Sequence, residues 1–385
     1  MRCLITGADG RLGRALTRAM TGRPDLTVWS LPKDRLDITS RSALERCMRE
    51  FRPDWVVNAA AVTRAPEDRL YEYDRVNAEG AGFVAEATRA AGARILQVST
   101  DYVFSGEGEA PWCERDRPSA RGPYGRSKEE GEYAVMRSGA AGYIVRAGWL
   151  HSGERDFVDA ILTRAARGEI LRVVDKQVGK PSETEAFAAW LVRVLTECPA
   201  PSRLEIEHYV ERGDYVSRLE EARFILSSAQ RHDEAHAAVW SRALVGLAPA
   251  RSPTPRNRLI AGSSVEKTIG ISEIPTESWQ KGVDNSVIKW LSLSANLWIT
   301  SPETEKGAAA RSRAVTPIGH QGISLRASIR SARRRGTCRR CRSGPASRGV
   351  FRRAKDRPSS RRCRLRGAER FQRRSSVRSP FQRRG

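Results

Sequence analysis

Short apolar runs alternate with amphipathic stretches along most of the chain. The runs are rich in β-branched and aromatic residues and predict buried strands at residues 2–6, 26–31, 55–61, 94–98, 142–149 and 171–175. Apolar residues at helical spacing predict helices at residues 12–20, 77–91, 156–167, 185–195, 217–229 and 279–291. A further helix is expected after Thr39. This alternation predicts an α/β fold with a doubly wound parallel sheet, which binds ligands beyond the carboxyl ends of its strands.

A glycine-rich turn separates the first strand from the first helix. Gly7, Gly10 and Gly13 follow the strand in a G-x-x-G-x-x-G spacing. Glycine permits a tight turn and a close approach of the backbone to a pyrophosphate, whose charge favours a helix N-terminus. A glycine triplet alone is weak evidence, but strand, turn and helix in this order predict a dinucleotide site in a Rossmann-type fold.

The second strand bears on which dinucleotide is bound. It does not end in the acidic residue that would bind a ribose 2′-hydroxyl, and Lys33 and Arg35 follow it. Two cations at this place favour a 2′-phosphate and hence NADPH, whereas NADH stays the alternative if both are only solvated loop residues. Asp37 is a candidate adenine contact. The third strand ends in small residues, which would let a cofactor lie close to residues 58–61.

A tyrosine and a lysine lie four residues apart further along the chain. If Pro123 opens a helix, Tyr124 and Lys128 lie one turn apart on one face. A phenol ordinarily titrates near pH ~10, and we expect the Lys128 ammonium to lower the pKa of Tyr124. The Thr100 hydroxyl, at the end of a predicted strand, would hold a substrate oxygen beside the phenol. Such pairs also occur by chance on exposed helices, but in this context they predict a proton-transfer site for a carbonyl or alcohol.

Four segments together resemble the extended short-chain dehydrogenases/reductases and, within them, the dTDP-4-dehydrorhamnose reductase family. The segments are residues 7–13, 57–61, 99–104 and 124–128, and a weaker likeness extends the resemblance over about residues 1–292. The resemblance implies a catalytic triad in which Tyr124 gives the proton and NADPH the hydride. The implied catalytic residues are Thr100, Tyr124 and Lys128. The implied cofactor contacts are Gly7, Asp9, Gly10, Arg11, Leu12, Asp37, Ile38, Asn58, Ala59, Ala60, Tyr124 and Lys128. The implied substrate contacts are Thr100, Asp101, Tyr102 and Trp149.

The residue after Asp101 separates two reactions within the superfamily. Nucleotide-sugar dehydratases place Asp-Glu after the triad threonine, whereas Tyr102 stands here in place of the glutamate. The resemblance therefore implies reduction of the 4-keto group of a nucleotide-linked 6-deoxyhexose, as in dTDP-rhamnose and polysaccharide biosynthesis. Residues 62–68 and 255–258 depart from the family pattern. A non-catalytic, NADP-binding regulatory relative therefore stays as the alternative.

Several other residues carry two interpretations each. Trp149 would stack on a sugar ring or cap the core, and Arg146 would pair with a substrate diphosphate or form a structural salt bridge. The three histidines at 208, 232 and 236 lack an accompanying ligand pattern, and the Cys338-x-x-Cys341 pair has no second pair. We therefore expect no metal site.

Net charge divides the chain into unequal parts. Residues 306–385 hold 26 Lys or Arg against Asp356 and Glu369, a balance of +24 that leaves about −1 of the total +23 for residues 1–305. We expect a Rossmann-type NADP-binding domain at residues 1–150, a smaller α/β domain mainly for the sugar nucleotide at residues 151–292, and a disordered Arg-rich tail at residues 293–385. The tail would bind nucleic acid without sequence preference, or is an out-of-frame translation of a GC-rich gene.

The compartment follows from features that the sequence lacks. No signal-peptide pattern precedes the first strand, and no apolar run approaches the ~20 residues that span a bilayer. The 7 cysteines show no regular framework, which is typical of free thiols in a reducing compartment. We therefore expect a cytoplasmic protein with a nucleotide-sugar substrate and no membrane partner, for which a homodimer is an allowed state.

Overall fold

The computed structural model describes residues 1–108, 110–212, 214–250 and 279–293. All of them belong to one compact unit, Met1–Pro317. Among these residues, no helix has the length and apolar character to span a membrane. The predicted tail lies outside the described residues except for Leu293, and the predicted connection at residues 249–255 is described only at Pro249 and Ala250.

Six strands form a sheet in which every neighbouring pair is parallel, in the order β10-β5-β4-β3-β1-β2. The strands are β1 (Arg2–Thr6), β2 (Thr27–Leu31), β3 (Trp55–Asn58), β4 (Arg94–Thr100), β5 (Gly142–Ala147) and β10 (Leu204–Tyr209). The order reverses beside β1, so the chain turns in opposite directions from β1 to β2 and from β3 onward. The predicted doubly wound parallel sheet is therefore confirmed.

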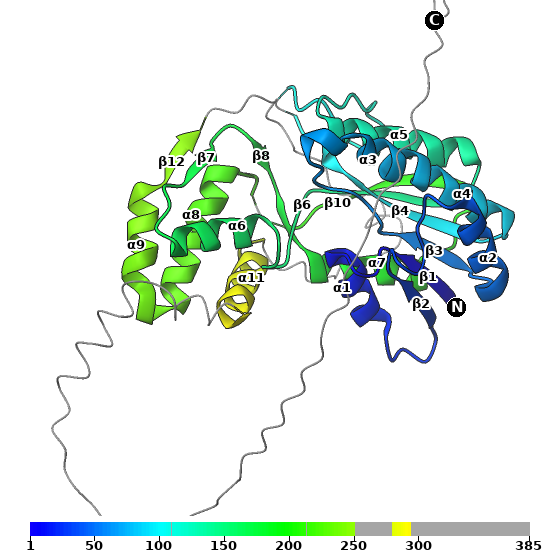
Figure 1. The fold of residues 1–385 in the computed structure, drawn as a ribbon, viewed down its shortest axis with the longest axis horizontal. Coiled ribbons are helices and arrows are strands. Elements are labelled where there is room, and N and C mark those ends of the chain that lie inside the picture. The colour runs from blue at the N-terminus through cyan, green and yellow to red at the C-terminus, as the bar shows by residue number, and fades with distance from the viewer. Residues whose placement is uncertain (109, 213, 251–278, 294–385) are drawn as a thin grey trace, which may run out of the picture. The chain divides into compact units, whose positions relative to one another are not determined.

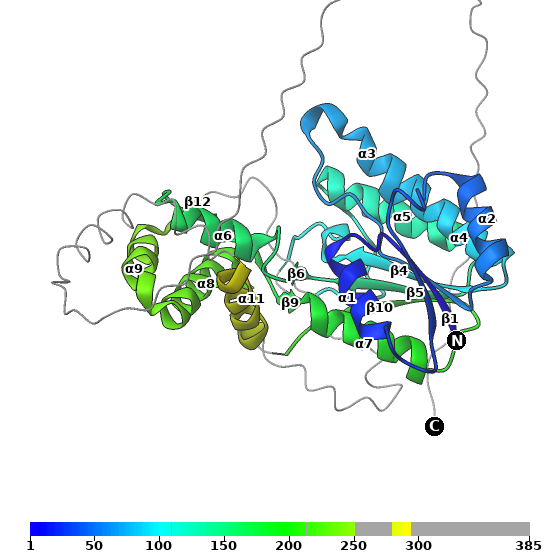
Figure 2. The same cartoon turned by 60° about the horizontal axis from the view of Figure 1, so that its bottom comes forward.

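Helices cover both faces of this sheet, as Figure 2 shows. One face packs on α1 (Arg11–Met20) and α7 (Thr184–Glu197), and its core contains Leu16, Phe187 and Trp190. The other face packs on α2 (Arg41–Phe51), α4 (Ala81–Ala90) and α5 (Pro123–Ser138). Each helix buries one apolar stripe, which explains why helical spacing in the sequence located α1, α4 and α7.

Helical residues also precede α4, where the sequence predicted one regular helix at residues 77–91. The short helices η1 (Glu67–Arg69) and α3 (Tyr71–Tyr73) lead into a π-helix, η2 (Asp74–Gly80), and α4 begins only at Ala81. Another short helix, η3 (Asp101–Val103), follows β4 directly. π-Helical turns mostly occur inside α-helices, so the sequence pattern did not separate η2 from α4.

A third core cluster lies among the helices that follow β5 (Figure 1). The helices are α6 (Phe157–Ala166), α8 (Arg218–His232), η4 (Glu234–His236), α9 (Ala237–Gly246) and α11 (Trp279–Leu293). Asp156 caps α6, and Ser217 with Glu220 forms a capping box at the start of α8. These caps satisfy N–H groups that a helix cannot satisfy internally, and they place both helix starts close to the predicted positions.

Three small strand pairs complete the described structure. They are β6 (Trp149–His151) with β9 (Pro181–Glu183), β7 (Arg172–Val174) with β12 (Ala248–Ala250), and β8 (Val178–Gly179) with β11 (Val216–Ser217). The strand predicted at residues 142–149 is interrupted at Gly148, so that β5 stays in the large sheet while β6 leaves it to pair with β9. Trp149 is thereby carried away from the sheet.

Candidate active site

The carboxyl end of β4 places a threonine and an aspartate next to each other. Thr100 is buried, and its hydroxyl donates to Asp101 Oδ1 at 3.0 Å and accepts from the backbone N–H of Tyr102 at 3.3 Å. The Thr100 side chain thus caps η3 and fixes the backbone turn that follows the strand. The same hydroxyl acts as a hydrogen-bonding neighbour that lowers the pKa of the Tyr124 phenol, so two of the predicted triad residues are brought together.

Helix α5 supplies the other two residues of the predicted triad. Pro123 stands at the first helical position after the N-cap Gly122, as expected from the sequence. A Cβ at Gly125 would lie 2.3 Å from the Tyr102 carbonyl oxygen, so only glycine lets the first turn of α5 approach η3 this closely. Tyr124 therefore stands directly against the end of β4.

Lys128 follows Tyr124 by one turn and is 4% exposed. Its ammonium donates to the Val98 carbonyl oxygen at 2.7 Å, which leaves two N–H donors for other partners. Burial lowers the pKa of Lys128 to about 8, and the nearby Glu132 carboxylate opposes this shift. The lysine is therefore close to its titration point at physiological pH.

The Tyr124 phenol differs from the expectation drawn from the sequence. Burial raises its pKa well above the ordinary value, the Asp101 carboxylate raises it further, and the hydrogen bond with Thr100 acts in the opposite direction. The expectation that Lys128 lowers this pKa is therefore wrong for this structure. The physical reason is that the Lys128 ammonium is directed to a backbone carbonyl group, while Asp101 lies close to the phenol.

Tyr102, a predicted substrate contact, packs edge-on against Tyr124. Their ring centroids are 5.9 Å apart with an interplanar angle of 66°, and the Tyr102 hydroxyl accepts from Gln177 Nε2 at 3.1 Å. Asp101, another predicted substrate contact, has no exposed surface. Its carboxylate is held within the protein beside Thr100 and Tyr124, where its negative charge raises the pKa of the phenol.

The glycine-rich turn lies beside the residues that follow β3. Gly7 has φ +67°, and a Cβ there would lie 2.6 Å from the Ala60 Cα, so the two backbones touch. A Cβ at Gly13 would lie 2.1 Å from the Gly7 carbonyl oxygen, which packs helix α1 tightly on the turn. Ala59 and Ala60 thus border the turn with small side chains, as predicted.

The start of α1 fits the diphosphate of a dinucleotide. Gly10 is its N-cap, and no side chain caps the first turn, so backbone N–H groups of Arg11 and Leu12 have no intrahelical partner. Unpaired N–H groups and the helix dipole attract an anion at this place. Asp9 is exposed, whereas Arg11 is half-buried, and its guanidinium donates to the Leu150 carbonyl oxygen at 3.3 Å.

The residues expected at the adenosine end lie after β2. Burial acts to raise the pKa of Asp37, but two hydrogen bonds from Thr39 and the charges of Lys33 and Arg75 lower it overall. Ile38 is buried against Gly80. Lys33 and Arg35 are exposed. The exposed cations Lys33 and Arg35 are compatible with a nucleoside that carries a further phosphate, whereas the ionised Asp37 would accept hydrogen bonds from N–H groups of the base.

Asn58 is also a predicted cofactor contact, but its side chain is directed along the edge of the sheet. Its Oδ1 accepts from the Thr6 hydroxyl at 2.6 Å, and its Nδ2 donates to Gln97 Oε1 at 2.8 Å. These bonds join the carboxyl ends of β1 and β3 to the middle of β4. The Asn58 side chain therefore holds three neighbouring strands together, while Ala59 and Ala60 after it lie against Gly7 of the glycine-rich turn.

The structure bears differently on the two interpretations given for each of Arg146 and Trp149. Arg146 is fully buried and forms a bidentate ion pair with Glu132 at 2.7 and 2.9 Å, so the structural salt bridge is present. The Trp149 ring is buried, and the Arg218 guanidinium lies 3.5 Å from its centroid. The Trp149 Nε1 donor has no hydrogen-bond partner among the residues that the structure describes. Arg218 thus covers one face of the Trp149 ring, and the ring's Nε1–H is left as a hydrogen-bond donor for a ligand.

Sequence reasoning missed three residues of this neighbourhood. Tyr73 packs against Tyr124, Asn77 donates to the Ser127 hydroxyl at 3.0 Å, and Glu132 accepts from the Ser99 hydroxyl. Glu132 lies four residues after Lys128, and this spacing alone could have placed it on the same helix face. No sequence signal identifies Tyr73, because its contact depends on the course of the preceding loop.

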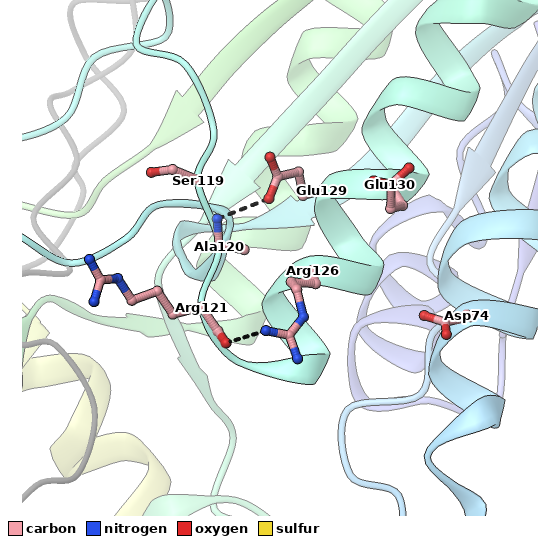
Figure 3. Close-up of a pocket in the computed structure, with 7 residues that line it drawn as sticks. All are labelled: Asp74, Ser119, Ala120, Arg121, Arg126, Glu129 and Glu130. Atoms are coloured by element: carbon pink, nitrogen blue, oxygen red, sulfur yellow. Dashed lines mark hydrogen bonds between the residues drawn. The ribbon is translucent and has the colours of Figure 1, made fainter. Parts of the chain in front are cut away.

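A pocket of about 690 Å³ lies beside the start of α5 (Figure 3). The residues that line it are Asp74, Ser119, Ala120, Arg121, Arg126, Glu129 and Glu130. Two hydrogen bonds, from Arg126 to the Arg121 carbonyl oxygen and from the Ala120 N–H to Glu129, hold its wall. None of the predicted triad residues lines this pocket, so we do not assign it to the reaction.

Comparison with known proteins gives consistent results. The family model described as RmlD substrate binding domain matches residues 1–291. A dTDP-4-dehydrorhamnose reductase of Mycobacterium tuberculosis (strain ATCC 25618 / H37Rv) is 36% identical over 279 residues, which cover 65% of this chain and 89% of the relative. One from Sinorhizobium fredii (strain NBRC 101917 / NGR234) is 36% identical over 209 residues, which cover 54% of this chain and 70% of the relative.

The solved structure of dTDP-4-dehydrorhamnose reductase from Bacillus anthracis str. Ames in complex with NADP has a TM-score of 0.63 and 26% identity, over 75% of this chain and 98% of that chain. The chain therefore belongs to the RmlD substrate binding domain family.

Proposed function

We propose that this chain is an NADPH-dependent oxidoreductase that reduces the 4-keto group of dTDP-4-dehydrorhamnose. The observation that carries the proposal is the close packing of the start of α5, which carries Tyr124 and Lys128, on the turn that follows Thr100 at the carboxyl end of β4. Membership of the family and the names of its relatives support the substrate. The NADP bound to the related Bacillus anthracis enzyme supports the cofactor.

The direction of the reaction is consistent with the state of Tyr124. Reduction of a ketone needs a phenol that still carries its proton, whereas oxidation of an alcohol needs a phenolate. Burial and the Asp101 charge raise the pKa of Tyr124, so the proton is present at neutral pH. When bound, NADPH supplies the hydride. Tyr124 then gives its proton to the oxygen of the forming alkoxide, and the Thr100 hydroxyl orients that oxygen.

Lys128 acts on binding in this scheme. Its ammonium is anchored on the Val98 carbonyl oxygen and keeps two further N–H donors, which suit the hydroxyl groups of the nicotinamide ribose. The N–H groups at the start of α1 would hold the diphosphate, with Ala59 and Ala60 beside it. Trp149 would offer its unpaired Nε1 donor to a sugar oxygen.

The test is a reduction assay with purified protein. We expect oxidation of NADPH, followed by absorbance, when dTDP-4-dehydrorhamnose is added. Tyr124→Phe should lower kcat by at least about 100-fold, in the range attributed to general acid catalysis, and should leave NADPH affinity nearly unchanged. Tyr133→Phe, on the same helix and outside the site, is the matched control.

Two results would contradict this proposal. A folded wild-type chain that binds NADPH and reduces none of several nucleotide sugars would favour a non-catalytic regulatory relative. A Tyr124→Phe chain with full turnover would remove the proton-transfer role from this residue.

We also propose the division of the chain and its partners that the sequence indicates. Residues 1–150 would form the NADP-binding domain, residues 151–292 would mainly bind the sugar nucleotide, and the substrate would lie between the ends of β4 and β6. A homodimer is proposed as the oligomeric state and is tested by light scattering. Nonspecific binding of nucleic acid is proposed for the basic residues 306–385 alone.

A further inference from the structure

The π-helix η2 and the short helix α3 pack against α5, the helix that carries Tyr124 and Lys128. A Cβ at Gly131 of α5 would lie 2.2 Å from the Asn77 carbonyl oxygen, so the two helices touch through backbone atoms. π-Helical turns are rare and are frequently found at functional sites. The consequence here is that the residue immediately before η2, Tyr73, faces the start of α5.

The Tyr73 side chain makes two kinds of contact, one through its ring and one through its hydroxyl. Its ring lies 6.0 Å from the Tyr124 ring between centroids, at an interplanar angle of 55°. Its hydroxyl accepts from the Ala65 N–H at 3.1 Å and donates to the Thr63 carbonyl oxygen at 3.4 Å. The side chain is 7% exposed, so both contacts are removed from bulk water.

The loop that Tyr73 holds follows the carboxyl end of β3. The backbone N–H and carbonyl oxygen of Val62 are both bonded to the Asn77 side chain at 2.8 Å. Beyond Val62, the Tyr73 hydroxyl bonds to both Thr63 and Ala65. Ligands of a doubly wound sheet bind beyond the carboxyl ends of its strands, so this loop borders the place where the substrate enters.

The Tyr124 ring thereby contacts two other tyrosine rings. Tyr102 is hydrogen-bonded to Gln177, and Tyr73 is hydrogen-bonded to the loop. Tilted and edge-on aromatic contacts restrict the orientation of a ring that they touch. A proton transfer depends strongly on the position of the donor atom, so this restriction bears on the chemical step.

We propose that Tyr73 is a positioning residue whose ring orients Tyr124 and whose hydroxyl fixes the loop at residues 62–65 beside the substrate. The proposal rests on the proposed function, because both effects are exerted on the reduction of the nucleotide sugar. It assigns separate tasks to two parts of one side chain: the ring governs kcat, and the hydroxyl governs KM for the sugar nucleotide.

Two substitutions separate these tasks. Tyr73→Phe keeps the ring and removes both hydrogen bonds, and we expect KM for the nucleotide sugar to rise by about 3- to 10-fold with kcat changed by less than about 2-fold. Tyr73→Leu removes the ring as well, and kcat should fall by about 10-fold or more. NADPH affinity should stay within about 2-fold in both, since neither contact involves the glycine-rich turn.

A second measurement reads the loop without turnover. The Ala65 amide donates to the Tyr73 hydroxyl, so its hydrogen exchange should be faster in Tyr73→Phe, as measured by mass spectrometry on a peptide that spans residues 62–69. Tyr71→Phe is the matched control, because Tyr71 is 58% exposed and belongs to the same short helix. If Tyr73→Leu folds poorly, Tyr73→Met, whose longer and more flexible side chain adapts to irregular gaps, tests the same loss of the ring.

The outcomes are distinct. Equal changes of kcat and KM in Tyr73→Phe and Tyr73→Leu would overturn the separation of tasks and leave a purely structural role. Unchanged exchange at Ala65 in Tyr73→Phe would overturn the role of the hydroxyl. A wild-type chain that binds NADPH and reduces no nucleotide sugar would contradict the proposed function and the kinetic role of Tyr73, whereas the exchange result would stand or fall separately.

Discussion

Lys128 carries its charge where almost no water reaches it. Its pKa, lowered by burial to about 8, leaves a part of the molecules without the ammonium proton at that pH. A dinucleotide brings negative charge, and negative charge favours the protonated form of a nearby amine. Binding should therefore raise the pKa of Lys128.

The first prediction at this scale follows from the sign of that shift. At pH 8, NADPH binding should take up a fraction of a proton per chain, at most about half, because a group near its pKa is only partly protonated before binding. Isothermal titration calorimetry in buffers of different ionisation enthalpy measures this uptake. Lys128→Met should remove it. A binding enthalpy that does not depend on the buffer in the wild-type chain would contradict the prediction.

Residue spacing predicted that Thr100, Tyr124 and Lys128 lie near one another, but it did not predict their electrostatics. Tyr124, Lys128 and Thr100 could be predicted because a helical turn and the end of a strand are local features. The pKa of Tyr124 could not, because Asp101 and the surrounding burial depend on how η3 meets α5. Asn58 is similar, since its position after an apolar strand is visible but its bonds to Thr6 and Gln97 come from other strands. The assignment of each residue to cofactor or substrate stays a prediction.

The Glu132 carboxylate joins helix α5 to the neighbouring strands β4 and β5. Glu132 of α5 accepts from Ser99 of β4 and from Arg146 of β5, and all of these side chains are buried. Since Ser99 precedes Thr100 and Glu132 follows Lys128 by one turn, the Ser99 hydrogen bond fixes β4 and α5 relative to each other, and the ion pair with Arg146 joins α5 to β5. The Glu132 carboxylate is therefore placed to hold the distance between Thr100 and Tyr124.

Breaking this pair should be costly. Glu132→Gln leaves the Arg146 guanidinium buried without a counter-charge, and we expect a loss of about 3–5 kcal/mol in the free energy of unfolding. Urea denaturation followed by circular dichroism measures the change. Glu130→Gln, exposed on the same helix, should change stability by less than about 0.5 kcal/mol. A similar small loss in both variants would show that the pair does not carry stability.

Most long elements could be predicted from their apolar periodicity, and the exceptions have physical causes. The edge strand β10 reads Leu-Glu-Ile-Glu-His-Tyr, and its charged positions hid a strand that pairs with β5 on one side only. Helix α9 buries only Trp240 completely, so it lacks the wide apolar stripe of its neighbours. The break at Gly148 could not be predicted, because β6 leaves the sheet to pair with β9, a strand much later in the chain.

At the scale of the whole molecule, charge and family likeness divide the chain at nearly the same place. The family model ends at residue 291, helix α11 ends at Leu293, and residues 306–385 hold the excess of arginine. A chain that ends at Leu293 should keep the NADPH affinity and turnover of the full chain. It should also lose any retention on DNA, which in the full chain should weaken steeply as salt rises.

Steady-state assays and DNA-cellulose chromatography at two salt concentrations test this prediction. Loss of activity or of folding in the shortened chain would show that residues beyond 293 are part of the enzyme. The expectation that these residues are disordered lies outside the described part of the chain and stays a prediction.

Helix α11 contacts parts of the chain that lie far away in the sequence. Trp290 donates to Asp159, 131 residues earlier, at 2.9 Å, and Val283 and Val287 fill the third core. Lys289 pairs with Glu154, which also pairs with Arg14 of α1. During synthesis, every strand of the large sheet has been made once Tyr209 is added, whereas the third core still lacks this helix. The apolar sides of α6 and α8 therefore stay without the cover of this helix until α11 leaves the ribosome.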